Sequence, residues 1–183
     1  DFRARLVVDA AGAWRGPVAR LAGATDIPLV PHRRTIVTFA PPPGLSIAGW
    51  PMIACDDLHL YFQPEAGDLM RSPMDEDAMA PCDPSPDDAV VADGLARFAR
   101  LAPALAPKSL KRRWSGLRTF APDRVHVVGE DPALPGFFWL AGQGGCGIET
   151  SPLIGRVAAD LVLHGRSDAF DTALLSPARF ARA

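Results

Sequence analysis

Short apolar runs separated by glycine, proline and aspartate dominate the chain and predict more strands than helices. The runs between residues 34 and 120 are close together and joined by tight turns, which favours one antiparallel sheet of roughly five or six strands. The predicted strands are Arg5–Ala11, Thr35–Phe39, Met52–Ala54, Leu58–Gln63, Asp68–Ser72, Lys108–Phe120, Val125–Val128 and Phe137–Ala141.

Three segments carry apolar residues at helical spacing. Trp14–Ala22 is followed by a glycine that can end a helix, and Ala89–Leu101 is expected to cover the sheet. Pro152–Leu163 has Ser151 in the position of an N-cap, its own proline at the first helical position, and Gly165 after its end. The acidic, proline-rich stretch Met74–Asp88 predicts a surface loop.

The composition argues against several classes of function. A net charge of −2 provides no basic field for nucleic acid and no polybasic membrane patch. The longest apolar stretch, Gly136–Ala141, is too short to span a bilayer. Three cysteines without C-x-x-C and four scattered histidines predict neither a disulfide framework nor a metal site. The start, Asp1-Phe2, has neither methionine nor leader, so we expect a cytoplasmic segment of a longer protein.

One glycine-rich turn fits G-x-G-x-x-G between a predicted strand and a predicted helix, at Gly142–Gly147. No strand with a terminal acid follows the helix, so a self-contained dinucleotide fold is not expected. Four glycines would let a planar ligand lie against the backbone, and the helix N-terminus would favour negative charge there. The alternative is a tight turn in which glycine only supplies positive φ.

A few polar residues lie at the start of a predicted strand or within one, and they are candidates for binding a substrate. Arg33 and Arg34 point to opposite faces, so at most one can face a pocket. Arg118 could clamp a carboxylate or form a structural ion pair, and Tyr61, the only tyrosine, could donate its hydroxyl or pack as a core ring.

The sequence lacks the motifs by which side chains alone catalyse hydrolysis or phosphoryl transfer. The sequence holds no nucleophile elbow, serine–histidine pairing or P-loop. The acidic runs Asp56-Asp57, Asp75–Asp77 and Asp87-Asp88 fall in predicted turns and loops, where a solvated surface is expected. Any chemistry must therefore come from a cofactor.

Several spaced segments together resemble the C-terminal half of the FAD-dependent D-amino acid oxidase superfamily, and within it the D-arginine dehydrogenase-type enzymes. The resemblance implies a mixed α/β fold: an antiparallel substrate-domain sheet beside the C-terminal part of a Rossmann-type FAD-binding domain whose N-terminal half is missing. The implied divisions are residues 1–30, 31–118 and 119–183. The segments that carry the likeness are Val7–Trp14, His32–Thr35, Phe39–Gly44, Trp50–Met52, Tyr61–Gly67, Trp114–Arg118 and Gly142–Ile148.

The resemblance also implies roles and a reaction. Arg34 and Arg118 would bind the substrate α-carboxylate and Tyr61 would orient it. A hydride would pass from the substrate Cα to flavin N5, giving an imino acid that hydrolyses to the keto acid. Glu149 and Cys146 depart from the residues more usual in the subgroup. The residues implied to contact FAD are Gly12, Gly142, Gly144, Gly145, Cys146, Gly147 and Ile148.

The family's phosphate-binding segment would precede this chain, so the chain alone is expected to bind FAD poorly and to need an N-terminal half or partner chain. The expected ligand is a small amino acid. Two alternatives stay open: a non-catalytic carboxylate-binding or interaction module, which would expose an apolar patch, and a glycine, sarcosine or 2-hydroxy-acid oxidase of the same superfamily.

Overall fold

A computed structural model describes residues 2–180. Contacts divide the chain into two compact units. Unit 1 comprises residues 1–32, 79–82 and 118–183, and unit 2 comprises residues 33–78 and 83–117. Residue 1 and residues 181–183, which belong to the predicted first and last divisions, lie outside the described residues.

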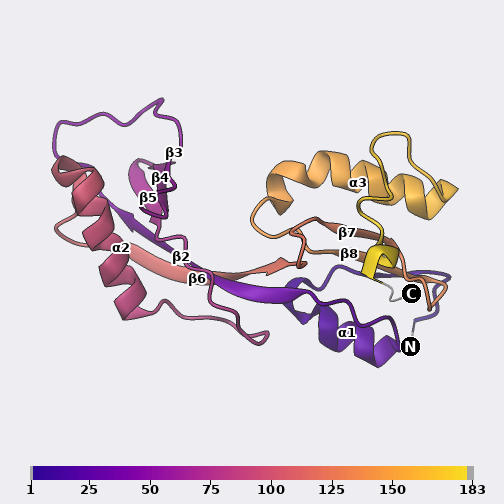
Figure 1. Cartoon of the computed structure of the whole chain (residues 1–183). Helices are drawn as coiled ribbons and strands as arrows, with labels where there is room; N and C mark the ends of the chain where they lie inside the picture. The colour runs from indigo at the N-terminus through magenta and orange to yellow at the C-terminus, as the bar shows by residue number, and fades with distance from the viewer. Residues whose placement is uncertain (1, 181–183) are drawn as a thin grey trace. The chain divides into compact units, whose positions relative to one another are not determined.

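Unit 2 is built on the five-stranded sheet, whose strand order is β3-β4-β5-β2-β6. Pairings β3–β4, β4–β5 and β5–β2 are antiparallel, which confirms the antiparallel sheet predicted from the sequence. Helix α2 lies along this sheet (Figure 1). The bounds are β2 Val30–Phe39, β3 Ile53–Cys55, β4 Leu60–Glu65, β5 Asp68–Ser72, α2 Asp88–Leu101 and β6 Arg112–Phe120.

The core of unit 2 lies between α2 and one face of the sheet. Phe98 of α2 packs edge-on against Phe62 of β4 and tilted against Phe39 of β2, with ring centroids 5.1 and 5.6 Å away. Asp87 caps the helix, because its carboxylate accepts hydrogen bonds from the N–H groups of Ala89 and Val90. The cap and the apolar stripe explain why this segment is helical and which face it buries.

Unit 1 is built on a three-stranded sheet with the order β1-β8-β7. Strand β1 (Val7–Asp9) is parallel to β8 (Phe137–Ala141), and β7 (Val127–Glu130) is antiparallel to β8. Helices α1 (Arg15–Ala22) and α3 (Gly147–His164) lie on opposite sides of the sheet (Figure 1).

Strand alternation assigns the two faces of this sheet to the two helices. Trp139 and Phe137 face Ala19 of α1, whereas Phe138 faces Val157 of α3. A short 3₁₀ turn, Gly12–Trp14, precedes α1, and the glycine at position 23 ends it in a left-handed conformation, as predicted.

Asp131 ties distant segments of unit 1 together. Its carboxylate accepts hydrogen bonds from the Trp139 indole at 2.8 Å and from the Thr25 hydroxyl and N–H at 2.9 Å each. The N–H groups of Ala133 and Leu134 complete the set. Burial alone would raise the pKa of Asp131, but these hydrogen bonds hold it below its usual value.

Several predicted boundaries differ from those observed, among them the start of β6, which is Arg112 and not Lys108, and the starts of β2 and α3. β2 begins at Val30, five residues before the predicted strand, so Arg33 and Arg34 lie inside it. α3 begins at Gly147, so Ser151 is not its N-cap. Pro152 lacks the N–H that would bond the Ile148 carbonyl, and the Ser151 hydroxyl donates to that carbonyl instead, at 2.7 Å. The predicted end of α3 is confirmed, because Gly165 is left-handed.

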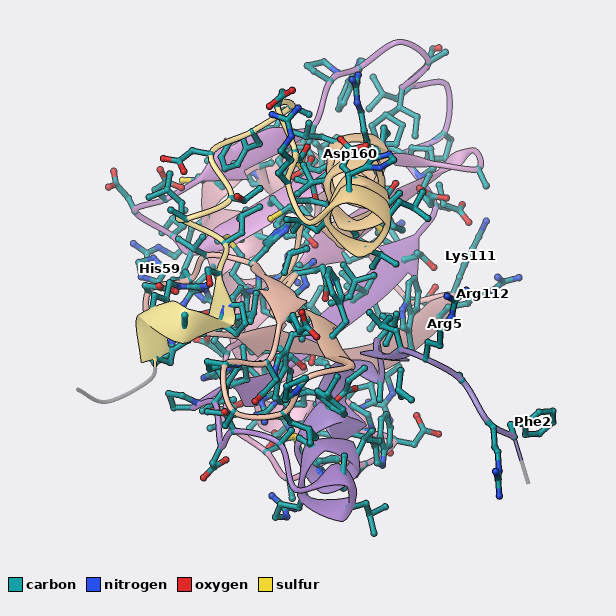
Figure 2. The ribbon with its side chains drawn as sticks, turned by 90° about the vertical axis from the view of Figure 1, so that its right-hand side faces the viewer. Phe2, Arg5, His59, Lys111, Arg112 and Asp160 are labelled. Carbon is teal, nitrogen blue, oxygen red and sulfur yellow. The ribbon has the colours of Figure 1, made fainter. Side chains whose placement is uncertain are left out.

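The side chains of Lys111 and Arg112, in unit 2, project from the surface (Figure 2). Lys111 forms an ion pair with Asp68 at 2.5 Å. Among residues 2–180, no helix combines the length and the apolar character needed to cross a membrane.

Candidate functional site: a buried arginine of unit 2 and a glycine turn of unit 1

Strand register brings Arg34 and Tyr61 to the same face of the five-stranded sheet. Thr38 of β2 is opposite Met70 of β5, and Tyr61 of β4 is opposite Ser72 of β5. Side chains two residues apart along a strand share a face, so Arg34, Thr38, Met70, Ser72 and Tyr61 all lie on one side. The odd-numbered positions of β2, such as Phe39, face α2. Two of the predicted substrate-binding residues are therefore on the face opposite α2.

Arg34 is buried and paired with a carboxylate. Only 5% of its side chain is exposed, and its Nη2 donates to Oε1 of Glu76 at 2.5 Å. Glu76, which is 34% exposed, was expected to lie on a solvated surface. Glu76 is exposed, as expected for this loop, and its carboxylate in addition pairs with the arginine in β2.

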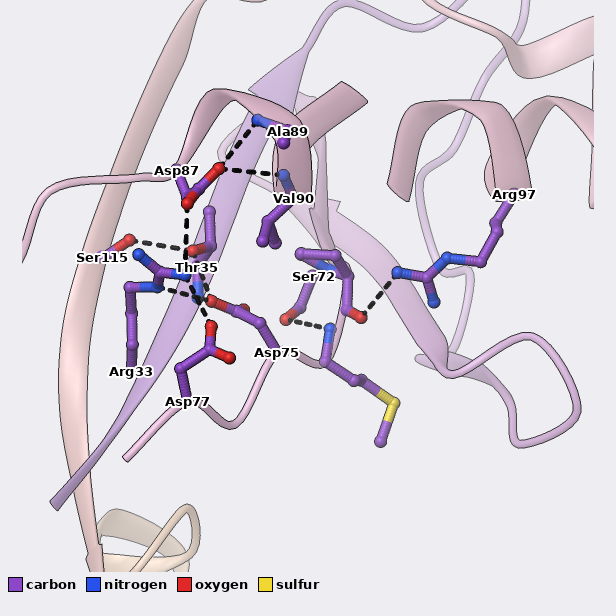
Figure 3. Close-up of polar contacts among 12 residues, drawn as sticks. Arg33, Thr35, Ser72, Asp75, Asp77, Asp87, Ala89, Val90, Arg97 and Ser115 are labelled. Atoms are coloured by element: carbon purple, nitrogen blue, oxygen red, sulfur yellow. Dashed lines mark hydrogen bonds and ion pairs between the residues drawn. The ribbon is translucent and has the colours of Figure 1, made fainter. Parts of the chain in front are cut away.

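Arg33, on the opposite face of β2, holds the residues on either side of Glu76. Its Nε donates to Asp75 at 3.2 Å and its Nη2 donates to Asp77 at 2.6 Å (Figure 3). Burial alone would lower the pKa of Arg33, but the hydrogen bonds to Asp77 and Asp75 raise it above its usual value. Arg33 therefore remains charged and fixes the loop after β5.

The expectation of a solvated surface is wrong for Asp75. Its side chain is only 4% exposed, and it accepts hydrogen bonds from the Thr35 N–H and hydroxyl at 2.7 Å each. The Thr35 hydroxyl also lies 2.9 Å from the hydroxyl of Ser115 in β6 (Figure 3). Two adjacent arginines in a strand need anions on both faces, and that was the signal in the sequence for this acidic loop.

The glycine turn of unit 1 packs against the end of β6. The N–H of Gly144 donates to the Thr119 carbonyl at 3.0 Å. A Cβ on Gly144 would lie 2.3 Å from the Phe120 ring, and a Cβ on Gly145 would lie 2.7 Å from Nη1 of Arg118. Close approach within the chain therefore explains part of the glycine content, and the structure brings Arg118 against the turn.

The opposite side of the turn, at the start of α3, is accessible. Gly145 is exposed and the Ile148 side chain is 92% exposed. The first N–H groups of α3 follow directly, and their partial positive charge suits an electron-rich group. Glu149 in the first turn adds negative charge of its own. The exposed turn and the helix N-terminus are open to a planar, electron-rich group, and Cys146 occupies the N-cap without a side-chain hydrogen bond.

Gly12 lies after β1 in unit 1. Its φ is +58° and a Cβ there would meet open space, so the backbone conformation alone requires glycine. Sequence reasoning missed a neighbour of this turn, Asp9, whose side chain is buried at the end of β1. Its Oδ1 accepts from the Ala11 N–H at 3.1 Å, and burial raises the pKa of Asp9. An acid ending an apolar strand was the available signal.

Known proteins with similar sequences are FAD-dependent oxidoreductases. A sequence profile of the DAO family, described as FAD dependent oxidoreductase, matches residues 1–161. Bovine FAD-dependent oxidoreductase domain-containing protein 1 is 30% identical over 200 residues, which cover 97% of this chain and 39% of that protein. Glycine oxidase from Geobacillus kaustophilus is 30% identical over 183 residues, covering 97% of this chain and 45% of the enzyme.

Solved structures of two oxidases share the fold of this chain. Iminodiacetate oxidase from Chelativorans superposes with a TM-score of 0.83 at 22% identity, over 96% of this chain and 47% of that one. Geobacillus kaustophilus glycine oxidase gives a TM-score of 0.76 at 28% identity, over 96% and 45%. The chain thus spans about two fifths of the length of the curated relatives it matches. The profile match over most of its length confirms the superfamily resemblance: the chain belongs to the DAO family of FAD-dependent oxidoreductases.

Proposed function

We propose that this chain is the substrate-binding and C-terminal flavin-contacting segment of an oxidoreductase that oxidises small amino acids, D-amino acids among them. The observation that carries the proposal is the buried guanidinium of Arg34 on the sheet face that also bears Tyr61, in a chain of an FAD-dependent family. Relatives named glycine oxidase and iminodiacetate oxidase support an amino-acid substrate.

Arg34 would bind the substrate α-carboxylate. A guanidinium can bind a carboxylate through two parallel hydrogen bonds, and burial strengthens each of them. Tyr61, half-buried on the same face, would donate its hydroxyl to the substrate and limit its rotation. We assign Arg118 as the second carboxylate-binding residue.

FAD, when bound, would accept the hydride from the substrate Cα. The N–H groups at the start of α3 would stabilise negative charge on the ring, as helix N-termini do for anions. We assign the flavin contacts to the turn residues Gly142, Gly144, Gly145, Cys146, Gly147 and Ile148, and to Gly12.

Complementation tests the proposal. The chain is combined with the remaining part of Geobacillus kaustophilus glycine oxidase and FAD, and mixed anaerobically with glycine or D-amino acids. We expect loss of the yellow flavin absorbance, and we expect the chain alone to bind FAD poorly. Arg34→Met should abolish bleaching, whereas Arg100→Met, at an exposed position on α2, should not.

Two results would count against the assignment. A soluble yellow complex that no amino acid bleaches would favour the non-catalytic carboxylate-binding alternative. Bleaching by a 2-hydroxy acid in preference to its amino analogue would favour the hydroxy-acid oxidase alternative.

A further inference from the structure

We propose that Glu76 makes the Arg34 site selective for acids that carry an ammonium group and excludes anionic acids that lack one. The inference rests on the proposed role of Arg34 in binding the substrate carboxylate. It assigns to Glu76 a specificity-determining role for an electrostatic reason.

The ion pair places a negative charge directly beside the guanidinium. Arg34 Nη2 and Glu76 Oε1 are 2.5 Å apart, and Arg34 is 5% exposed while Glu76 is 34% exposed. The pair has no net charge, and the carboxylate is its more accessible partner. A ligand that approaches Arg34 therefore comes close to a negative charge as well as a positive one.

The loop keeps Glu76 in this place. Asp75 on one side of it accepts hydrogen bonds from Arg33 and from Thr35, and Asp77 on the other side accepts from Arg33. The carbonyl of Pro73, two residues before Asp75, accepts from Arg97 at 3.2 Å. Because residues on both sides of Glu76 are anchored, the backbone at position 76 is held beside Arg34, within reach of its ion pair.

A zwitterionic amino acid matches this pair. Its carboxylate can bind the guanidinium while its ammonium group lies beside the Glu76 carboxylate, so every charge has an opposite neighbour. A 2-hydroxy acid or 2-oxo acid offers the same carboxylate without the ammonium group, and its negative charge is repelled by Glu76. Repulsion of the wrong ligand is a general source of specificity.

The consequence extends to turnover. Hydrolysis of an imino acid consumes water, releases the nitrogen as ammonium and leaves an anionic 2-oxo acid. That product lacks the group that Glu76 attracts, so it is held more weakly than the amino acid that preceded it.

Ligand binding to the full 183-residue chain tests the inference. The probes are D-alanine, D-lactate and pyruvate, which differ only at the group on C2. Dissociation constants come from the chemical-shift changes of backbone amide signals in ¹⁵N-labelled protein, which every variant retains. We expect the unsubstituted chain to bind D-alanine at least about tenfold more tightly than D-lactate or pyruvate.

Variants isolate the contribution of Glu76. In Glu76→Gln the preference for D-alanine over D-lactate should fall by about tenfold, chiefly because D-lactate binds more tightly. Glu76→Asp, which keeps the charge, should retain the preference. Glu65→Gln removes an exposed charge from β4 of the same sheet and should leave it unchanged.

Each remaining outcome is decisive. Equal binding of D-alanine and D-lactate by the unsubstituted chain, or an unchanged preference in Glu76→Gln, overturns the inference. If Arg34→Met still abolishes D-alanine binding, the proposed role of Arg34 survives that result. If no probe binds, or if Arg34→Met binds D-alanine normally, both the role of Arg34 and the inference about Glu76 fail.

Discussion

The guanidinium of Arg71 occupies the space that a side chain on Gly94 would need. A Cβ on Gly94 would lie 2.2 Å from Nη2 of Arg71 and 2.8 Å from the Cβ of Pro73. Arg71, on β5, is fully buried, and its guanidinium lies 5.6 Å from the centre of the Phe98 ring. Its three side-chain nitrogens have no hydrogen-bond partner among residues 2–180. Helix α2 can pack on the sheet only because position 94 has no side chain.

Gly94→Ala should destabilise unit 2 although alanine favours helices. We expect the free energy of unfolding to fall by about 1–3 kcal/mol, because Pro73 cannot yield and Arg71 is enclosed. Gly155→Ala is the matched control, since Gly155 lies within α3 with open space around its Cβ. It should raise stability by about 0.4–1 kcal/mol. Urea denaturation of both variants measures the two effects, and changes of the same sign would contradict this account.

Arg71→Met should stabilise the chain. Burial lowers the pKa of Arg71 to about 10, with further lowering from the nearby charge of Arg97. A buried cation without hydrogen bonds disfavours folding, and a flexible apolar side chain of similar length removes that penalty. We expect a gain of about 1–4 kcal/mol in urea denaturation. Arg100→Met, at an exposed position on α2, should change stability little, and a loss in Arg71→Met would contradict the prediction.

Asp131 should make unit 1 sensitive to acid. Its pKa is lowered from the ordinary value of 3.8, so its ionised form stabilises the fold above that pH. This contribution is lost as the pH falls below 3.8 through the value in the folded state. In Asp131→Asn an amide NH₂ would face the N–H donors of Thr25 or Trp139. Stability at neutral pH should then fall by about 2–4 kcal/mol, with a weaker acid dependence.

Thermal unfolding between pH 7 and pH 2 checks the Asp131 prediction. Asp168→Asn, which removes an exposed carboxylate of unit 1, is the control and should behave like the unsubstituted chain. An unaltered acid dependence in Asp131→Asn would show that other carboxylates control acid unfolding.

The two acids beside Glu76 should differ in their effect on stability. Asp75→Asn should cost about 1–3 kcal/mol, because Asp75 is buried and accepts from both Thr35 and Arg33. Asp77→Asn should cost about 1 kcal/mol or less, because the Asp77 side chain is 60% exposed. Urea denaturation of the two variants measures both losses of stability. Equal losses would mean that burial of the carboxylate does not decide its contribution to stability.

Local patterns predicted most of the elements. The predicted strands Asp68–Ser72 and Phe137–Ala141 have the same bounds as β5 and β8, and the glycines at positions 23 and 165 end their helices as predicted. The start of α3 was missed because Pro152 fits either the first turn of a helix or, with help from Ser151, a position further inside.

Pairings between distant residues could not be predicted from those patterns. Glu76 meets Arg34 across 42 residues, and nothing in a window of ordinary length connects the two. The same holds for Arg118 and Gly145, whose contact depends on how β6 meets the turn after β8. The candidate residues were recognisable as unusual polar positions within strands, whereas their partners came only from the fold.

Unit 1 is formed by segments that are far apart in the sequence, and this affects how the chain folds during its synthesis. Thr25 and its partner Asp131 are 106 residues apart, and nearly all of unit 2 lies between them. At roughly 5–20 residues per second, the ribosome needs about 5–20 s to deliver the second residue after the first. During that interval α1 and β1 have emerged without β8 or α3, so their apolar side chains depend on chaperones or on a neighbouring segment for protection from aggregation.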